Sequence, residues 1–216
     1  MPEAVADLGL RGAPNLEALA AVAPELILIS NFYERQRAAF SRIAPVRALS
    51  VYADDAPWPA AEALARDLAA LAGSPARGDA YVAEVAAEFA ALRRPSARPV
   101  FAISLGDGRH FRAFGGDSIF GAALDRLGRA NAWPQPTRYA AAAPLGIEVL
   151  ARVPEAAIVV VGPLPEEARR ALATGPVWKA LPAAKAGRVA VLPPVNHYGG
   201  LPAARRFARL LAAADV

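Results

Sequence analysis

Six polar or aromatic residues lie at the ends of predicted strands or in the loops that follow them, in both halves of the chain. They are Arg11, Tyr33, Tyr139, Asn196, His197 and Tyr198. Open α/β sheets bind their ligands beyond the carboxyl ends of the strands. Aromatic walls with a few hydrogen-bond donors suit a bulky, oxygen-rich ligand. We therefore predict a ligand-binding cleft and take these six side chains as its candidate residues.

The sequence contains little that could carry out catalysis. It lacks the glycine-rich phosphate motifs, HExxH and GxSxG, and its two histidines and no cysteine cannot build a His/Cys metal cage. His110 begins a predicted strand and is interpreted as structural. His197 lies in a loop beside two glycines and could belong to a site or only to the surface. We expect a binding protein with no catalytic residue, metal or cofactor, and keep an enzyme, such as a hydrolase or metal chelatase, as the alternative.

Composition narrows the classes of partner. The 216 residues are 55% hydrophobic, enough for the core of one large domain or two small ones. No run of about 18 strongly apolar residues is present, so no membrane span is predicted. The start of the chain has neither a basic head nor an apolar run, so we identify no signal peptide in it. The net charge is only +4 and the arginines are spread along the chain, so we expect no nucleic-acid partner.

A long helix is predicted over residues 74–94. Ser74 is a good N-cap, Pro75 suits the first helical position, and Pro95 ends the helix. Apolar residues recur at helical spacing along it. About twenty residues at 1.5 Å each make a rod of roughly 30 Å, the width of a small domain.

The segments on either side of this helix resemble each other. Residues 16–29 and 147–160 both read as a short helix that opens with an apolar residue and a glutamate, then Pro-Glu, then a buried strand. We predict an α/β fold of two lobes, residues 1–73 and 95–216, joined by the helix of residues 74–94. The alternation of strands and helices favours mostly parallel sheets covered by helices.

Apolar runs and turn residues place the other elements. Strands are predicted at residues 26–30, 48–52, 100–105, 110–114, 157–161 and 188–192. Helices are predicted at residues 60–71, 119–127, 147–152, 166–174 and 201–214. Loops are predicted at residues 54–59, 131–144 and 193–200, where proline and glycine gather.

The segment DLGLRGAPNLEALAAVAPELILIS at residues 7–30 resembles the substrate-binding proteins of bacterial iron-siderophore ABC importers, above all the ferric-hydroxamate binders. Shorter matches continue to Val-Asn-His-Tyr-Gly at residues 195–199. The resemblance implies two α/β lobes on one long helix, with a ferric siderophore bound between the lobes. It also implies a periplasmic monomer that delivers its ligand to an ABC permease dimer at the inner membrane. Members of this family begin with a signal peptide and a first part of the N-terminal lobe, so we expect that lobe to be incomplete here.

The resemblance also implies roles for the candidate residues. Arg11 and Tyr33 would donate hydrogen bonds to hydroxamate oxygens around iron, which requires no vacant iron site. Tyr139 and the loop from Asn196 to Tyr198 would supply the second lobe, with Tyr139 and Asn196 standing where relatives carry tryptophan. Haem is the alternative ligand, because Tyr33 and His197 could face each other and tyrosine and histidine can ligate haem iron.

Glu17 and Glu148 open the two matched short helices. A carboxylate there favours its own helix N-terminus. In the resembling family, acids at these positions dock on arginines of the permease. Charges at the rim of an interface set orientation and partner choice. We therefore identify Glu17 and Glu148 as candidate permease-docking residues.

Overall fold

The structure is a computed structural model that describes residues 5–52, 56–137, 144–214 and 216. The chain divides into two compact units, Met1–Ala53 and Asp54–Val216.

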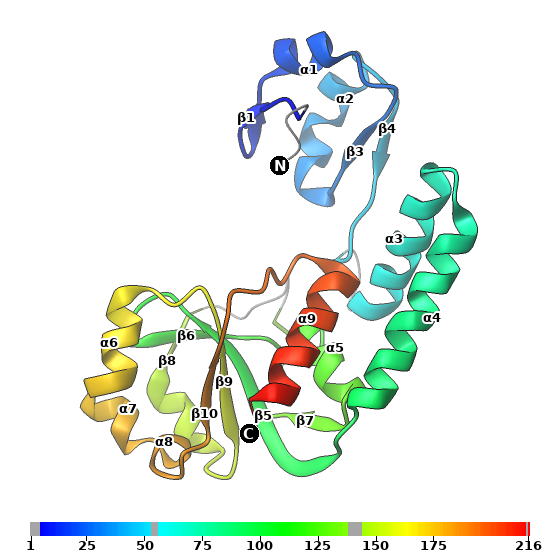
Figure 1. The fold of residues 1–216 in the computed structure, drawn as a ribbon. Coiled ribbons are helices and arrows are strands. Elements are labelled where there is room, and N and C mark those ends of the chain that lie inside the picture. Colours follow the sequence, from blue (N-terminus) through cyan, green and yellow to red (C-terminus); the bar gives the residue numbers. More distant parts are fainter. Residues whose placement is uncertain (1–4, 53–55, 138–143, 215) are drawn as a thin grey trace. The chain divides into compact units, whose positions relative to one another are not determined.

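The first unit combines two small sheets with short helices. Its strands are β1 (Gly9–Leu10), β2 (Ala13–Pro14), β3 (Ile27–Ile29) and β4 (Val46–Ala48). Its helices are α1 (Leu16–Val22), the 3-10 helix η1 (Asn31–Gln36) and α2 (Arg37–Phe40). Strands β1 and β2 form an antiparallel hairpin, while β3 and β4 pair in parallel (Figure 1).

The core of the first unit forms where α1 packs on β3. Asn15 starts α1, because its side-chain oxygen accepts from the backbone N–H groups of Glu17 and Ala18 at 3.0 Å each. Buried residues then meet between helices and strand, namely Leu19, Ile27, Ile29, Phe40 and Ala44. The prediction that the strand is buried along its whole length was wrong, because Leu28 points away from this core and is 46% exposed.

Strand β4 lies two residues earlier than predicted. Its register is fixed by β3: Ile27 N donates to Pro45 O at 2.9 Å, and Leu49 N donates to Ile29 O at 2.8 Å. The parallel pairing with β3 therefore ends where the apolar run from Ala48 had predicted the strand to begin.

The second unit is built on a six-stranded mixed sheet. Its strands are β5 (Ser96–Leu105), β6 (His110–Ala113), β7 (Arg129–Asn131), β8 (Leu145–Gly146), β9 (Ala157–Val161) and β10 (Val189–Leu192). The order is β10-β9-β5-β6-β8, and β7 also pairs with β5. Strands β10, β9, β5 and β7 run in parallel, whereas β6 and β8 are antiparallel to their neighbours. The predicted α/β fold class is confirmed.

Helices lie on both sides of this sheet (Figure 1). One group consists of α3 (Pro57–Leu71), α4 (Pro75–Leu92), α5 (Ile119–Arg126) and α9 (Gly200–Ala213). The other consists of α6 (Glu166–Thr174), α7 (Pro176–Ala180) and α8 (Pro182–Lys185), with the 3-10 helix η2 (Ile147–Arg152) beside α7. The core on the α6–α8 side includes Phe101, Ile158 and Trp178.

Helix α4 is present where the long helix was predicted. It begins at Pro75, although the Ser74 side chain forms no cap hydrogen bond. It packs closely on α3, since a Cβ added at Gly78 would lie 2.9 Å from the Ala69 Cβ. Helix α3 starts at Pro57, inside the predicted loop, because proline suits the first helical position.

Ion pairs join α4 to α9. Arg205 binds Glu84 at 2.6 Å and Glu88 at 2.5 Å, and Arg209 also binds Glu88. The hydrogen bonds from Arg209 and Arg205 hold the pKa of Glu88 below its usual range. The Arg205 guanidinium also lies over the Tyr81 ring, 5.4 Å from its centroid.

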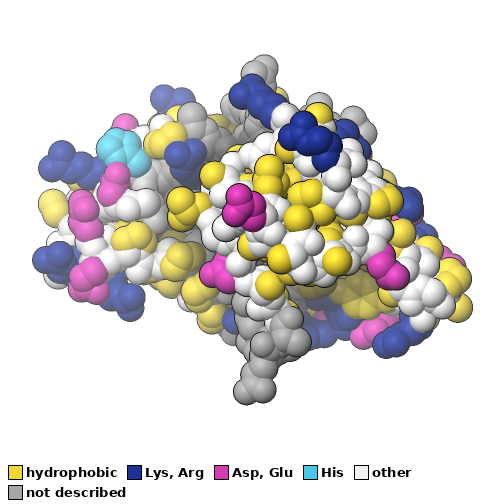
Figure 2. All heavy atoms as spheres, turned by 90° about the horizontal axis from the view of Figure 1, so that it is seen from above, with side chains coloured by type: hydrophobic (Ala, Val, Ile, Leu, Met, Phe, Trp, Pro, Cys, Tyr) yellow, Lys and Arg dark blue, Asp and Glu magenta, His cyan; other side chains and the backbone are white. Residues whose placement is uncertain are grey.

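The surface mixes the two signs of charge. On the face that Figure 2 shows, Lys and Arg side chains are interspersed with Asp and Glu, with hydrophobic side chains between them. In the parts of the chain that the structure describes, no helix has the length and apolar character needed to cross a bilayer.

Candidate functional site

Arg11 lies in the turn of the β1–β2 hairpin. Its side chain is exposed, and its guanidinium carbon lies 5.3 Å from the centroid of the Phe32 ring. Gly12 follows with φ of +89°, a backbone conformation that favours glycine at this turn. The hairpin therefore presents a cation beside an aromatic ring that is itself 57% exposed.

Tyr33 reaches the same turn from η1, directly after β3. The Gly12 N–H donates to the phenol oxygen at 3.4 Å, and the Gln36 side chain donates to the Gly12 carbonyl at 2.6 Å. The Tyr33 ring packs edge-on against Phe32, with centroids 5.0 Å apart. Arg11 and Tyr33, both predicted from the sequence, are thus brought together around Gly12. Among the described residues, the Tyr33 phenol oxygen accepts this one hydrogen bond, from the Gly12 N–H.

Phe32 and Gln36 support this turn, but neither was predicted from the sequence. Phe32 precedes Tyr33 in the chain, and its ring lies under the Arg11 guanidinium. Gln36 lies three residues after Tyr33, a spacing that puts both on one side of a helical turn. That spacing was the available signal, but it required knowledge that the segment after β3 is helical.

Asn196, His197 and Tyr198 lie in the loop between β10 and α9. The Asn196 side chain accepts from the Tyr198 N–H at 3.0 Å, which fixes the turn. The His197 ring packs against the Tyr198 ring at 4.1 Å and against the buried Phe114 ring at 5.4 Å, between centroids. Burial lowers the pKa of His197, so the imidazole is neutral at pH 7. The rings of Phe114, His197 and Tyr198 are therefore in contact one after the other, from the buried Phe114 to the half-exposed Tyr198.

Tyr139, the remaining predicted ligand residue, lies outside the described residues. Thr137 is buried, and its N–H and hydroxyl both donate to the Asp117 carboxylate at 2.7 Å. The Gly115 N–H donates in turn to the Thr137 hydroxyl at 3.3 Å. A Cβ at Gly115 would lie 2.7 Å from the Gln135 carbonyl oxygen, so this corner accepts only glycine without rearrangement.

Glu17 and Glu148 are both exposed in the first turns of their helices. The two helices differ in kind, because α1 is an α-helix and η2 is a 3-10 helix. The Glu148 carboxylate lies against the backbone of Gly146, since a Cβ added at Gly146 would be 2.1 Å from Glu148 Oε1. The structure gives neither carboxylate an ion pair among the described residues. The docking role of both residues stays a prediction.

The chain matches known proteins over nearly its whole length. The profile of the periplasmic binding protein family matches residues 1–195. Over 216 residues the chain is 30% identical to the iron(3+)-hydroxamate-binding protein FhuD of Escherichia coli, covering 98% of this chain and 73% of that protein. This chain belongs to the periplasmic binding protein family. Its predicted resemblance to the substrate-binding proteins of iron-siderophore importers is confirmed.

Solved structures of other binding proteins share the fold. The siderophore-binding protein FhuD of Vibrio cholerae, bound to Fe3+-Desferal, is 27% identical with a TM-score of 0.88, covering 99% of this chain and 82% of that one. The petrobactin-binding protein YclQ of Bacillus subtilis has a TM-score of 0.81 at 21% identity, covering 97% of this chain and 76% of that one. At that lower identity the likeness concerns the fold alone.

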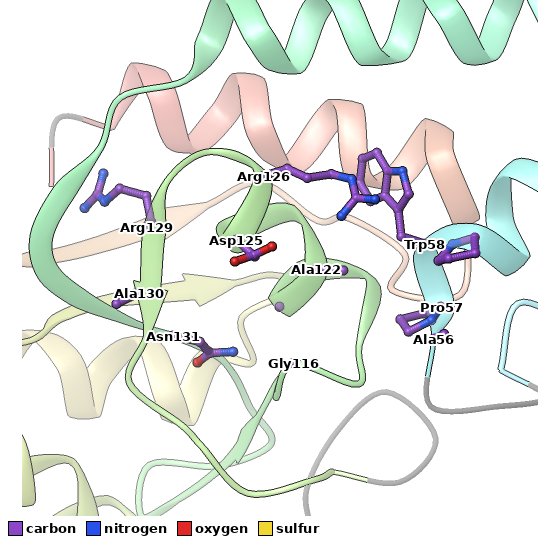
Figure 3. A pocket seen from close by; sticks show the side chains of 12 residues that line it. Ala56, Pro57, Trp58, Gly116, Ala122, Asp125, Arg126, Arg129, Ala130 and Asn131 are labelled. Atoms are coloured by element: carbon purple, nitrogen blue, oxygen red, sulfur yellow. The ribbon is translucent and has the colours of Figure 1, made fainter.

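A separate pocket of about 410 Å³ lies in the second unit of this binding protein, between the start of α3, α5 and β7 (Figure 3). The Arg126 guanidinium stacks on the Trp58 indole, 4.1 Å from its centroid, and the indole N–H donates to Glu62 at 2.7 Å. None of the five predicted ligand residues that the structure describes lines this pocket. The contact of Arg126 with Trp58 joins α5 to α3.

His110 has a local structural contact. Its Nδ1 lies 3.0 Å from Asp107 Oδ2 in the turn between β5 and β6. The N–H groups of Arg109 and His110 donate to the same carboxylate, which holds the pKa of Asp107 below its usual range. Among the described residues, no three His, Cys, Asp or Glu side chains are grouped so that they could hold a metal ion.

Proposed function

We propose that this protein binds a ferric siderophore of the hydroxamate type and delivers it to the permease of an ABC importer. The observation that carries the proposal is the grouping of Arg11, Phe32 and Tyr33 around Gly12. The second contribution comes from the aromatic surface of His197 and Tyr198. In this proposal the ligand is contacted by residues of both units.

The chemistry of these groups suits a hydroxamate complex of iron. Hydroxamate oxygens carry negative charge that is shared with the ferric ion. A guanidinium and a phenol can donate charge-assisted hydrogen bonds to these oxygens from outside the iron coordination shell. The exposed faces of Phe32 and Tyr198 can cover the apolar linkers between the hydroxamate groups. Such binding requires no chemical step, which agrees with a transport component and with no catalytic role.

The named relatives support the hydroxamate class. The relative from Escherichia coli is an iron(3+)-hydroxamate-binding protein, and the solved relative from Vibrio cholerae holds Fe3+-Desferal. Desferal is a linear hydroxamate, so its ferric complex is the first ligand to test. Haem is the competing ligand, because a tyrosine and a histidine are available as iron ligands.

Native mass spectrometry of the purified protein mixed with ferrioxamine, ferrichrome or haem tests the proposal. We expect a one-to-one adduct with a ferric hydroxamate and none with the iron-free ligand. An adduct with haem alone, accompanied by a Soret band, would replace the siderophore with haem. Failure to bind any ferric siderophore would contradict the proposal.

We further propose that Glu17 and Glu148 dock on basic residues of the permease. The double variant Glu17→Arg with Glu148→Arg should bind ferrioxamine normally but fail to stimulate the ATPase of the cognate permease in vesicles. Opposite charges at the rim of an interface set the orientation of the partners more than the affinity for the ligand. ATPase stimulation should therefore be lost while ferrioxamine binding is unchanged. The matched control is Glu25→Arg with Glu155→Arg, exposed acids that follow the paired prolines. Equal stimulation by both double variants would leave Glu17 and Glu148 as helix N-terminal acids only.

A further inference from the structure

Strand β10 forms an edge of the six-stranded sheet, and no described element pairs with its outer side. On its inner side, the carbonyls of Arg188 and Leu192 accept N–H groups from the β9 segment at 2.9 and 3.2 Å. Backbone groups alternate along a strand, so the N–H and C=O groups of Val189 and Val191 face away from β9. The outer edge therefore offers unpaired donors and acceptors to an incoming strand.

An apolar groove of about 410 Å³ accompanies this edge. Helices α6, α7 and α8 stand in a row beside β10 (Figure 1). The groove is lined by Leu172, Trp178, Ala184, Val189 and Val191, with Lys179 at its side. Val191 is 49% exposed, so part of this lining is open to solvent. An extended segment paired with β10 could place alternate side chains in the groove.

The segment of residues 176–192, which supplies most of the groove's lining, is basic. Residues 176–192 contain Lys179, Lys185 and Arg188 but no acidic residue, and these two lysines are the only lysines of the chain. Both are exposed at the ends of α7 and α8. A second copy of this chain would bring the same cations to the contact, and like charges across an interface oppose association. The charge therefore favours an acidic occupant from a different protein.

We propose that β10 and this groove form a docking site for an extended, acidic segment of a partner protein. The segment adds a strand to the sheet through the outward backbone groups of Val189 and Val191. Its apolar side chains enter the groove, and its carboxylates lie near Lys179 and Lys185. This mode of recognition combines backbone hydrogen bonds for affinity with side-chain pockets for specificity. It concerns a surface separate from the residues proposed to bind the siderophore.

A synthetic peptide serves as the probe. The acidic probe has a central Val-Thr-Val-Thr-Val flanked by two glutamates at each end, and the basic probe carries lysines instead. Fluorescence polarisation should show saturable binding of the acidic probe at about 100 µM or tighter. The basic probe should bind at least tenfold more weakly. In amide NMR spectra of the labelled protein, the largest shifts should occur at Val189 and Val191.

Substitutions in strand β10 and at the two lysines separate the contribution of the backbone hydrogen bonds from that of the charges. Val191→Pro removes an outward N–H while leaving the bonds to β9, so it should weaken the acidic probe at least tenfold. Val191→Thr retains the N–H and is the matched control. Lys179→Glu with Lys185→Glu changes only exposed side chains, and it should reverse the preference between the probes even if the proline variant folds poorly.

Three results would overturn the proposal. The first is the absence of saturable binding of either probe up to about 1 mM. The second is equal binding of the acidic and basic probes, which would mean that the lysines only guard an open edge against aggregation. The third is dimerisation of the protein alone through β10, seen by sedimentation, which would make a second copy the occupant.

Discussion

Arg11 and Tyr33 share one hairpin turn but are held there to different degrees. Tyr33 contacts the Gly12 N–H through its oxygen and packs against the rings of Phe32 and Phe40. Arg11 is exposed, and the Phe32 ring is the described contact of its guanidinium. The phenol is therefore preorganised, whereas a ligand must order the guanidinium at a cost in side-chain entropy.

Replacing Tyr33 with phenylalanine tests the preorganised donor. The ring packing remains and one O–H is lost, a contribution of about 0.5–1.5 kcal/mol. We expect ferrioxamine affinity to fall about two- to tenfold, with little change in Tm, when binding is followed by fluorescence quenching. Tyr81→Phe, in α4, is the control and should bind as the unaltered protein does. A loss larger than a hundredfold would indicate that the phenolate ligates iron directly.

The packing of His197 predicts a dependence of stability on pH. Burial lowers its folded pKa below the ordinary value of 6.5, so the unfolded state binds the proton more readily. This contribution to stability is present above pH 6.5 and is lost as the pH falls towards the folded pKa. The free energy of unfolding should decline less between pH 7.5 and 5.5 in His197→Gln than in the unaltered protein. If urea unfolding gave the same decline in the free energy of unfolding with pH for both proteins, burial of His197 would not be its cause.

The long helices could be predicted from the sequence, whereas the short strands could not. Proline and apolar spacing located α4 and α5 to within a few residues, because helix signals are local. The short strand β7 (Arg129–Asn131) was not predicted, because it has no apolar alternation and forms by pairing with β5. Arg11 and Tyr33 could be predicted as site residues from their places after strands. Their meeting around Gly12 could not, since it depends on a hairpin and a 3-10 helix coming together.

The ion pairs between α4 and α9 are expected to contribute to the stability of the second unit. Glu88 binds two arginines and its side chain is 16% exposed, whereas the Glu84 side chain is 62% exposed. Glu88→Gln should lower the free energy of unfolding by about 1–3 kcal/mol, since Arg205 and Arg209 lose a charged partner. Glu84→Gln is the matched control and should cost less than about 1 kcal/mol. Equal losses in urea unfolding would contradict the greater contribution of the Glu88 ion pairs.

At the scale of the whole molecule, the chain consists of two compact units of unequal size. Helices α3 and α4 belong to the second unit, Asp54–Val216. The predicted division into lobes at residues 1–73 and 95–216 with a connecting helix at 74–94 stays a prediction. It depends on contacts between distant segments, which periodicity and capping residues do not encode. Membership of the periplasmic binding protein family follows instead from a match over residues 1–195.

Recognition of a ferric hydroxamate by Arg11 can be tested by titrating the Arg11→Ala variant with ferrioxamine. Loss of a charged donor should cost about 1.5–3 kcal/mol, or roughly ten- to a hundredfold in Kd. Arg42→Ala, another exposed arginine of the first unit, is the control and should leave Kd unchanged. Equal affinities of the Arg11 variant and the unaltered protein for ferrioxamine would mean that Arg11 does not contact the ligand.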